Sequence, residues 1–186
     1  MPKSMGLKFI GHGFTSESDQ SVGNHLISLL AEKRFHSFTW FFAFASESGI
    51  TGLSSYIEKA KANFHAMNII VGIDQRATSK EALEAILALN VNAFVFYQPS
   101  FSIFHPKVYL FEGQEGSELI VGSSNLTTQG LFANVESSLM VSCDNREGAE
   151  NEVISQLKSY FGGIRLLISG IPFLANSNGK LGAQLL

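Results

Sequence analysis

Two largely apolar runs, residues 38–44 and residues 67–73, constrain the fold of this chain most strongly. A strand without alternation of polar and apolar residues is buried on both faces, as in a sheet that helices cover. Segments with helical periodicity lie between these runs, and three further strand-like segments follow in the second half. This order predicts an α/β fold with a mixed, mostly parallel β-sheet flanked by helices on both faces.

The expected boundaries follow from periodicity and from local start and stop signals. Thr78 and Glu81 form a possible capping box before a helix. Asp144 is a possible cap for the last helix, which Gly162 and Gly163 are expected to end. The expected strands are residues 7–14, 38–44, 67–73, 93–97, 108–111, 118–121 and 134–141, and the expected helices are residues 20–34, 53–64, 80–89 and 146–161.

The composition indicates one domain with apolar surface to spare. The chain has 186 residues, a length typical of a single domain. Charged residues make up 16% against a typical ~25%, while 45% are hydrophobic, including 16 Phe. This supply exceeds the need of one core and suggests a subunit interface. We expect a single catalytic domain over residues 1–186, in which residues 164–186 form a terminal segment or a linker to a further domain.

Composition also limits location and partners. The first residues lack the long apolar region of a signal peptide, and no stretch approaches the ~20 apolar residues that span a bilayer, so we expect a cytoplasmic protein without membrane contact. Cys143, the single cysteine, is expected to be a buried thiol. The net charge of −3 argues against a general basic coat, so any DNA contact is confined to a local groove or supplied by a specificity or helicase module elsewhere.

The residues that carry chemistry gather between positions 104 and 136. The segment after Pro106 is β-branched and aromatic, which predicts a strand, and residues two apart on a strand share a face. His105 and Lys107 are therefore expected side by side. An imidazole attacks phosphorus or transfers a proton, and a neighbouring ammonium neutralises phosphoryl oxygens. The pair alone also fits a chance arrangement at a solvated sheet edge, which Pro106 would suit.

The next expected strand ends at Gly122, and polar residues follow it. A residue without a side chain lets backbone N–H groups and the hydroxyls of Ser123 and Ser124 approach an anion. Asn125 adds an amide donor. Glu136 lies near the start of the following strand, where a carboxylate can hold an imidazole by one ring nitrogen and fix its tautomer. Together these residues predict a pocket for a phosphate ester.

His-x-Lys followed by Gly-Ser-x-Asn resembles the signature of the phospholipase D superfamily, present here in one copy. The runs HPKVYLF and GSSNLTTQGLFANVE are similar in particular to the nuclease branch. That branch includes BfiI-like and NgoFVII-like restriction endonucleases and domains associated with helicases. The family pattern has an Asp five residues after the lysine, where this chain has Glu112.

The resemblance implies a role for each matched residue. His105 would be the nucleophile of a phosphohistidine intermediate, Lys107 and Asn125 would bind phosphate oxygens, Ser123 would support that pocket, and Glu136 would orient a histidine. The proposed jobs of His105 and Lys107 require no metal, and the sequence shows no Asp/Glu/His cluster of the kind that holds catalytic Mg²⁺, so we expect no metal and no cofactor. Because this chemistry uses two imidazoles and the chain has one His-x-Lys, we expect a homodimer with one composite site.

We expect a metal-independent phosphodiesterase, specifically a nuclease that cuts DNA and a candidate cleavage domain of a restriction endonuclease. The alternative is a catalytically idle module of the same fold that dimerises or binds nucleic acid beside a helicase or restriction system. Hydrolysis of lipid headgroups has less support, because no interfacial helix or basic membrane patch is visible. Outside the motif, His12 could line a cleft at a strand end, but a loop position is expected. Asp74, at the end of a strand, is the better candidate for a cleft, but a turn or cap role is expected. Trp40 and its neighbouring phenylalanines are expected in the core.

Overall fold

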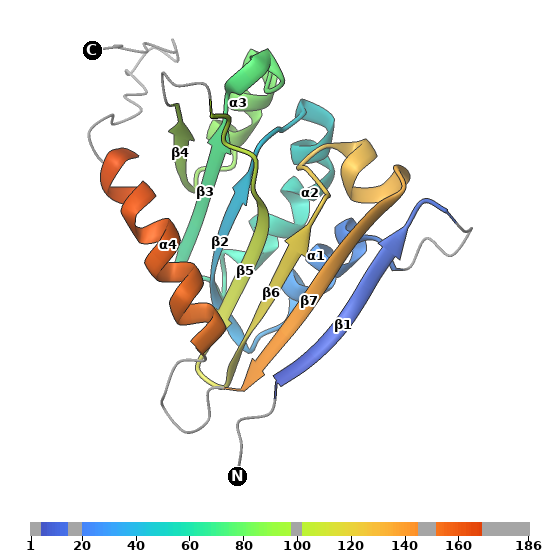
Figure 1. Cartoon of the computed structure of the whole chain (residues 1–186), viewed down its shortest axis with the longest axis vertical. Helices are drawn as coiled ribbons and strands as arrows, with labels where there is room; N and C mark the ends of the chain where they lie inside the picture. The colour runs from blue at the N-terminus through green and yellow to red at the C-terminus, as the bar shows by residue number, and fades with distance from the viewer. Residues whose placement is uncertain (1–4, 15–19, 98–101, 145–151, 169–186) are drawn as a thin grey trace.

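The computed structural model describes residues 5–14, 20–97, 102–144 and 152–168. Seven strands form one sheet in the order β1-β7-β6-β5-β2-β3-β4 (Figure 1). Helices α1 to α3 cover one face, and α4 crosses part of the other. The predicted mixed sheet with helices on both faces is confirmed. The strands are β1 (Met5–His12), β2 (Phe35–Phe42), β3 (Ala66–Gly72), β4 (Asn92–Phe96), β5 (Lys107–Gly113), β6 (Gly116–Gly122) and β7 (Glu136–Asp144), and the helices are α1 (Val22–Ala31), α2 (Glu47–Ala60), α3 (Lys80–Ala88) and α4 (Glu152–Ile168).

The strand pairing is more antiparallel than predicted. β2, β3 and β4 are parallel neighbours, whereas the four pairs that join β2, β5, β6, β7 and β1 are antiparallel. The connections explain this difference. Helices return the chain between the parallel strands, while the two residues between β5 and β6 can close only an antiparallel hairpin.

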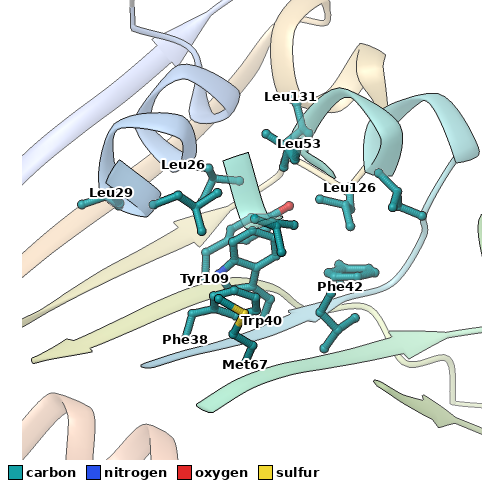
Figure 2. Close-up of a cluster of buried hydrophobic side chains, with 14 of the residues drawn as sticks. Leu26, Leu29, Phe38, Trp40, Phe42, Leu53, Met67, Tyr109, Leu126 and Leu131 are labelled. Carbon is teal, nitrogen blue, oxygen red and sulfur yellow. The ribbon is translucent and has the colours of Figure 1, made fainter. Parts of the chain in front are cut away.

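The main core lies between the sheet and helices α1 to α3. Trp40 is fully buried, stacks on Phe38 with ring centroids 4.3 Å apart, and meets Tyr109 edge-on at 5.6 Å. Figure 2 shows this aromatic layer under Leu26 of α1 and Leu53 of α2. Trp40 thus lies in the core, as predicted.

Helix α4 covers the opposite face incompletely. Its Phe161 stacks on Phe41 of β2 with centroids 4.0 Å apart, and its Ile154 packs in a second cluster that includes the buried Cys143. Figure 1 shows α4 over the β2, β3 and β4 side of the sheet, while no described helix lies over β1 and β7 on this face. None of the helices in the described ranges is long and apolar enough to cross a membrane.

Ser79, and not Thr78, caps helix α3. The Ser79 hydroxyl accepts from the Ala82 N–H at 3.2 Å. The Thr78 hydroxyl instead donates to the Gly72 carbonyl oxygen at 2.8 Å and accepts from the Ala45 N–H at 3.2 Å. The capping box predicted from Thr78 is therefore wrong, because tertiary contacts engage that hydroxyl.

Helix α4 continues through Gly162 and Gly163 to Ile168, so the predicted stop is wrong. Glycine lowers helix stability but keeps its N–H, so the hydrogen-bond ladder can pass through the pair. Asp144 is the last residue of β7. The expected helix start at residue 146 and the expected terminal segment from residue 169 onward lie outside the described residues.

Candidate active site

The last residues of β2 and β6 and the first residues of β5 and β7 lie at the same end of the sheet. β5 starts at Lys107 opposite Phe42, the last residue of β2. β6 ends at Gly122 opposite Ser138 of β7, and Glu136 is the first residue of β7. Because β5 runs antiparallel to β2, and β7 antiparallel to β6, the first residues of β5 and β7 lie at the same end of the sheet as the last residues of β2 and β6 (Figure 1). The topology therefore brings the motif residues together.

His105 and Lys107 are in direct contact. The Nζ of Lys107 lies 2.7 Å from Nδ1 and 3.0 Å from Nε2 of His105, and it donates to the His105 carbonyl oxygen at 3.2 Å. His105 precedes β5, so the pair does not alternate along a strand as predicted, and the lysine side chain reaches back to the imidazole instead. β5 is an interior strand between β6 and β2, which excludes the alternative of a chance pair at a solvated sheet edge.

Burial and charge tune both groups. Although His105 is exposed, partial loss of hydration, and then the positive charge of Lys107, lower the pKa of its imidazole below the ordinary value. The Lys107 side chain is itself buried, which lowers its pKa, while the Glu136 carboxylate raises it. A lowered pKa favours the neutral His105 imidazole, the form in which a ring nitrogen can attack or accept a proton.

Asn125 is oriented by the end of β2. Its Oδ1 accepts from the backbone N–H of Phe44 at 3.2 Å, so the amide NH₂ is the end left to donate to a substrate. The next residue, Leu126, donates its N–H to the Phe44 carbonyl oxygen at 3.1 Å. The Leu126 side chain is buried in the main core (Figure 2). This anchor fixes the loop that carries the amide donor.

Phe44 is a site residue that sequence reasoning missed, because the apolar run places it in a buried strand. β2 ends at Phe42, and the half-buried ring of Phe44 meets the His105 ring edge-on with centroids 5.5 Å apart. The same ring centroid lies 5.8 Å from the Nζ of Lys107, a distance at which a ring face attracts a cation. Its position at the carboxyl end of a strand, where α/β sites collect, is the signal that points to it.

The segment that leads into β5 is held on both sides. Asp74 Oδ2 accepts from the Phe104 N–H at 2.7 Å, and the Pro106 carbonyl oxygen accepts from the Ala43 N–H at 2.9 Å. Asp74 begins a short 3-10 turn, η2 (Asp74–Arg76), so its expected turn role is confirmed. Through Phe104 it also positions the residue that follows, His105.

The Gly-Ser-Ser turn contributes less to an anion pocket than predicted. Gly122 is required by packing, because a Cβ there would lie 2.0 Å from the Oγ of Ser138. Ser124 is 1% exposed and its carbonyl oxygen accepts from the Tyr109 hydroxyl at 2.9 Å, so burial argues against the predicted contact with substrate. The Ser123 N–H donates to a carbonyl oxygen of β7 at 3.1 Å. The exposed Ser123 hydroxyl is then the group of this turn that can face a substrate.

Glu136 lies beside the pocket, but no described contact joins it to His105 of the same chain. Among the described residues its carboxylate accepts from the Ser123 hydroxyl and, at 3.2 Å, from the Asn134 amide. Burial, and then the Glu136 charge, raise the pKa of Tyr109. The described contacts therefore do not give Glu136 the predicted role of orienting His105 within one chain.

Glu112, at the position of the family Asp, lies near the end of β5, away from the active site. Its carboxylate forms an ion pair with the Nζ of Lys158 in α4 at 2.6 Å. The pair ties α4 to β5, so Glu112 contributes to the packing of α4 on the sheet.

The site combines a neutral nucleophile with positive and polar groups that suit phosphoryl oxygens. His105 supplies the nucleophile, Lys107 the buried cation, and Asn125 the oriented amide. Within the described part of the chain, no three His, Cys, Asp or Glu side chains are grouped so as to hold a metal ion.

Comparison with known proteins assigns this chain to a family. The model of the family described as "Cardiolipin synthase, PLD-like domain" matches residues 31–165, which include every motif residue named above. A comparison with curated proteins found no match.

Solved structures share the fold at low identity. NucT from Helicobacter pylori is 17% identical with a TM-score of 0.59, covering 88% of this chain and 97% of its own. Nuc from Salmonella typhimurium, a phospholipase D family member, is 16% identical with a TM-score of 0.54, covering 90% and 95%. Phosphatidylserine synthase from Haemophilus influenzae Rd KW20 is 12% identical with a TM-score of 0.59, covering 89% and 40%. The chain belongs to the phospholipase D-like domain family.

Proposed function

We propose that this protein is a phosphodiesterase that cleaves DNA through a phosphohistidine intermediate, without a metal ion. The observation that carries the proposal is the 2.7 Å contact between Lys107 Nζ and His105 Nδ1. Asn125 lies at the same end of the sheet. A neutral imidazole against a buried ammonium suits attack on phosphorus whose oxygens bear negative charge.

The proposed reaction has two displacements. A ring nitrogen of a neutral His105 attacks phosphorus and the P–O bond to the leaving group breaks. The leaving oxygen takes a proton from a second imidazole, which starts the reaction in its protonated form. Water then attacks the phosphohistidine and gives a proton to that second imidazole, and the P–N bond breaks to release a phosphate monoester. Lys107 and Asn125 hold the non-bridging oxygens in both steps.

The second imidazole in this proposal is His105 of a second copy. No other histidine of the chain has a lysine two residues on. A twofold interface is self-complementary, so it can bring both copies of His105 into one cleft. It can also bring His105 of one copy to Glu136 of the other.

An uncovered apolar sheet face supports pairing with a second copy. The described residues include twelve exposed large apolar side chains, and seven of these lie on β1, β6 or β7 or within two residues of the ends of these strands near the active site. They are Met5, Leu7, Phe9, Phe14, Val121, Val135 and Leu139. None of the residues of β1, β6 and β7 that share a face with Leu139 is charged, and interface cores are depleted of charge in the same way. Leu139 pairs with Phe9 and with Val121, which adjoins Gly122, so this apolar face runs to the active site.

The substrate class rests on the resemblance of the motif to the nuclease branch and on the charge of the chain. A net charge of −3 with 13 Lys and Arg leaves phosphate binding to a local groove. We therefore propose cleavage at this groove with sequence recognition by another module, as in the cleavage domain of a restriction endonuclease. An idle module of the same fold would share the apolar face but would show no turnover.

Cleavage is expected to persist in excess EDTA, because Lys107 and Asn125 neutralise the phosphoryl oxygens in place of a metal. The test follows hydrolysis of DNA and of bis(p-nitrophenyl) phosphate with chelator and with added Mg²⁺. Activity that disappears in EDTA and returns with Mg²⁺ would contradict the proposal. No turnover under either condition would favour the idle module.

Replacing Leu139 by Glu is expected to dissociate the dimer, because it places a charge in the centre of the apolar face. Light scattering should then report the 20.3 kDa mass of one chain, with loss of activity. Tyr56→Glu is the matched control, since Tyr56 is an exposed aromatic residue on α2, away from this face. In mixtures of wild-type and His105→Ala chains, activity should fall faster than the wild-type fraction. A fully active single chain would refute the composite site.

A further inference from the structure

His12 is a buried imidazole that the proposed mechanism does not use. It is the last residue of β1 and is 4% exposed, so the loop position expected from its flanking glycines is wrong. Neither ring nitrogen has a hydrogen-bond partner among the described residues. Buried polar side chains nearly always have a partner, so one without a partner needs an explanation.

The sheet register sets His12 directly across from Glu136. Residues directly opposite in an antiparallel pair carry their side chains on the same face, with Cβ atoms ~4.5–5.5 Å apart. His12 is therefore the cross-strand neighbour of the carboxylate that is proposed to orient a histidine.

Gly13 keeps this pairing close. Its φ is +86°, and a Cβ at this position would lie 2.0 Å from the carbonyl oxygen of Asn134. Glycine alone permits both the backbone conformation and the approach. The end of β1 therefore packs closely against the segment that leads into Glu136, which explains the glycine after His12.

The Glu136 carboxylate has room for a further donor. An ionised carboxylate offers about four acceptor positions, and the described contacts use two, from Ser123 and Asn134. The Ser123 hydroxyl is also the group of its turn that can face a substrate, and when it does so the carboxylate loses that donor.

We infer that His12 is a positioning residue for Glu136: its ring N–H donates to the carboxylate and holds it in the orientation that the reacting imidazole requires. The inference rests on the proposed function, in which Glu136 orients His105 of the second copy. His12 does not touch substrate, and its effect passes through Glu136. Outer partners of catalytic and ligating groups fix direction and basicity in this way.

The kinetic test compares three variants. His12→Leu fills the space without a donor and should lower kcat roughly 10–100-fold with KM unchanged. His12→Gln keeps a donor and should recover most of the lost rate. His25→Leu is the matched control, since His25 on α1 also has a buried, unpartnered Nε2 and should keep the wild-type rate. Equal melting temperatures would show that the variants are folded.

A second measurement needs no turnover. The ring-nitrogen resonances of His12 should move when Glu136 is replaced by Gln, while those of His25 stay in place. Wild-type kcat in His12→Leu, equal rates for His12→Leu and His12→Gln, or His12 resonances that ignore Glu136→Gln would each overturn the inference. An inactive wild-type protein whose His12 resonances respond would refute the proposed function and leave the contact intact.

Discussion

Replacing His105 by Ala should lower the rate of phosphodiester cleavage at least ~10³-fold, because it removes the nucleophile instead of one stabilising donor. Single-turnover rates on DNA and on a chromogenic phosphodiester measure the effect. His65→Ala is the matched control, because His65 is exposed and precedes β3 at the end of the sheet opposite the active site. Near-normal turnover in His105→Ala would refute the mechanism.

The wild-type protein should also yield a trapped intermediate. Rapid acid-free quenching with a ³²P-labelled substrate is expected to leave label on the protein in an acid-labile, base-stable bond. Phosphopeptide mapping should place that label on His105. A burst of product without covalent label would show direct attack by water.

Removing either anion-binding group should cost about 10²-fold in rate, the size expected for one oxyanion-stabilising donor. Lys107→Ala removes the buried cation, and Asn125→Ala removes the amide that Phe44 orients. The two variants should lower kcat more than they raise KM, because the contacts strengthen as charge builds on phosphorus.

The two variants should differ in their pH dependence. The Lys107 charge lowers the pKa of His105, so its removal should raise that pKa. The acidic limb of kcat/KM requires neutral His105, and it should therefore move to higher pH in Lys107→Ala and stay in place in Asn125→Ala. An unchanged limb in Lys107→Ala would show that burial alone sets the pKa of the nucleophile.

The local patterns predicted the elements well where burial follows a short period. Helical periodicity within residues 20–34 predicts one apolar face made of Val22, Leu26, Leu29 and Leu30. In α1 this face is buried, because each member lies within one or two turns of the next. The start of α2 was harder, since it begins six residues before the predicted position, where Ser46 caps it through the Gly49 N–H. The Ser46 cap therefore sets the start of α2, ahead of the apolar residues from which the helix was predicted.

The site was predictable only where its chemistry is consecutive in the chain. His105 and Lys107 lie two positions apart, so their contact could be expected from sequence. The roles of Phe44 and Asp74 depend on pairing between strands far apart in sequence, which local patterns do not specify. Gly122 shows the converse, since a residue assigned to anion binding proves to be required by Ser138 of the neighbouring strand.

The hydrogen bond from the Phe44 N–H to Asn125 makes one part of the pocket insensitive to side-chain identity. Every residue except proline has this N–H, so the amide of Asn125 keeps its direction whichever side chain position 44 carries. An alanine scan would therefore attribute to Phe44 only its ring contacts with His105 and Lys107. Position 44 is free to diverge among relatives while the main chain preserves the geometry, so sequence variation there understates its importance to the site.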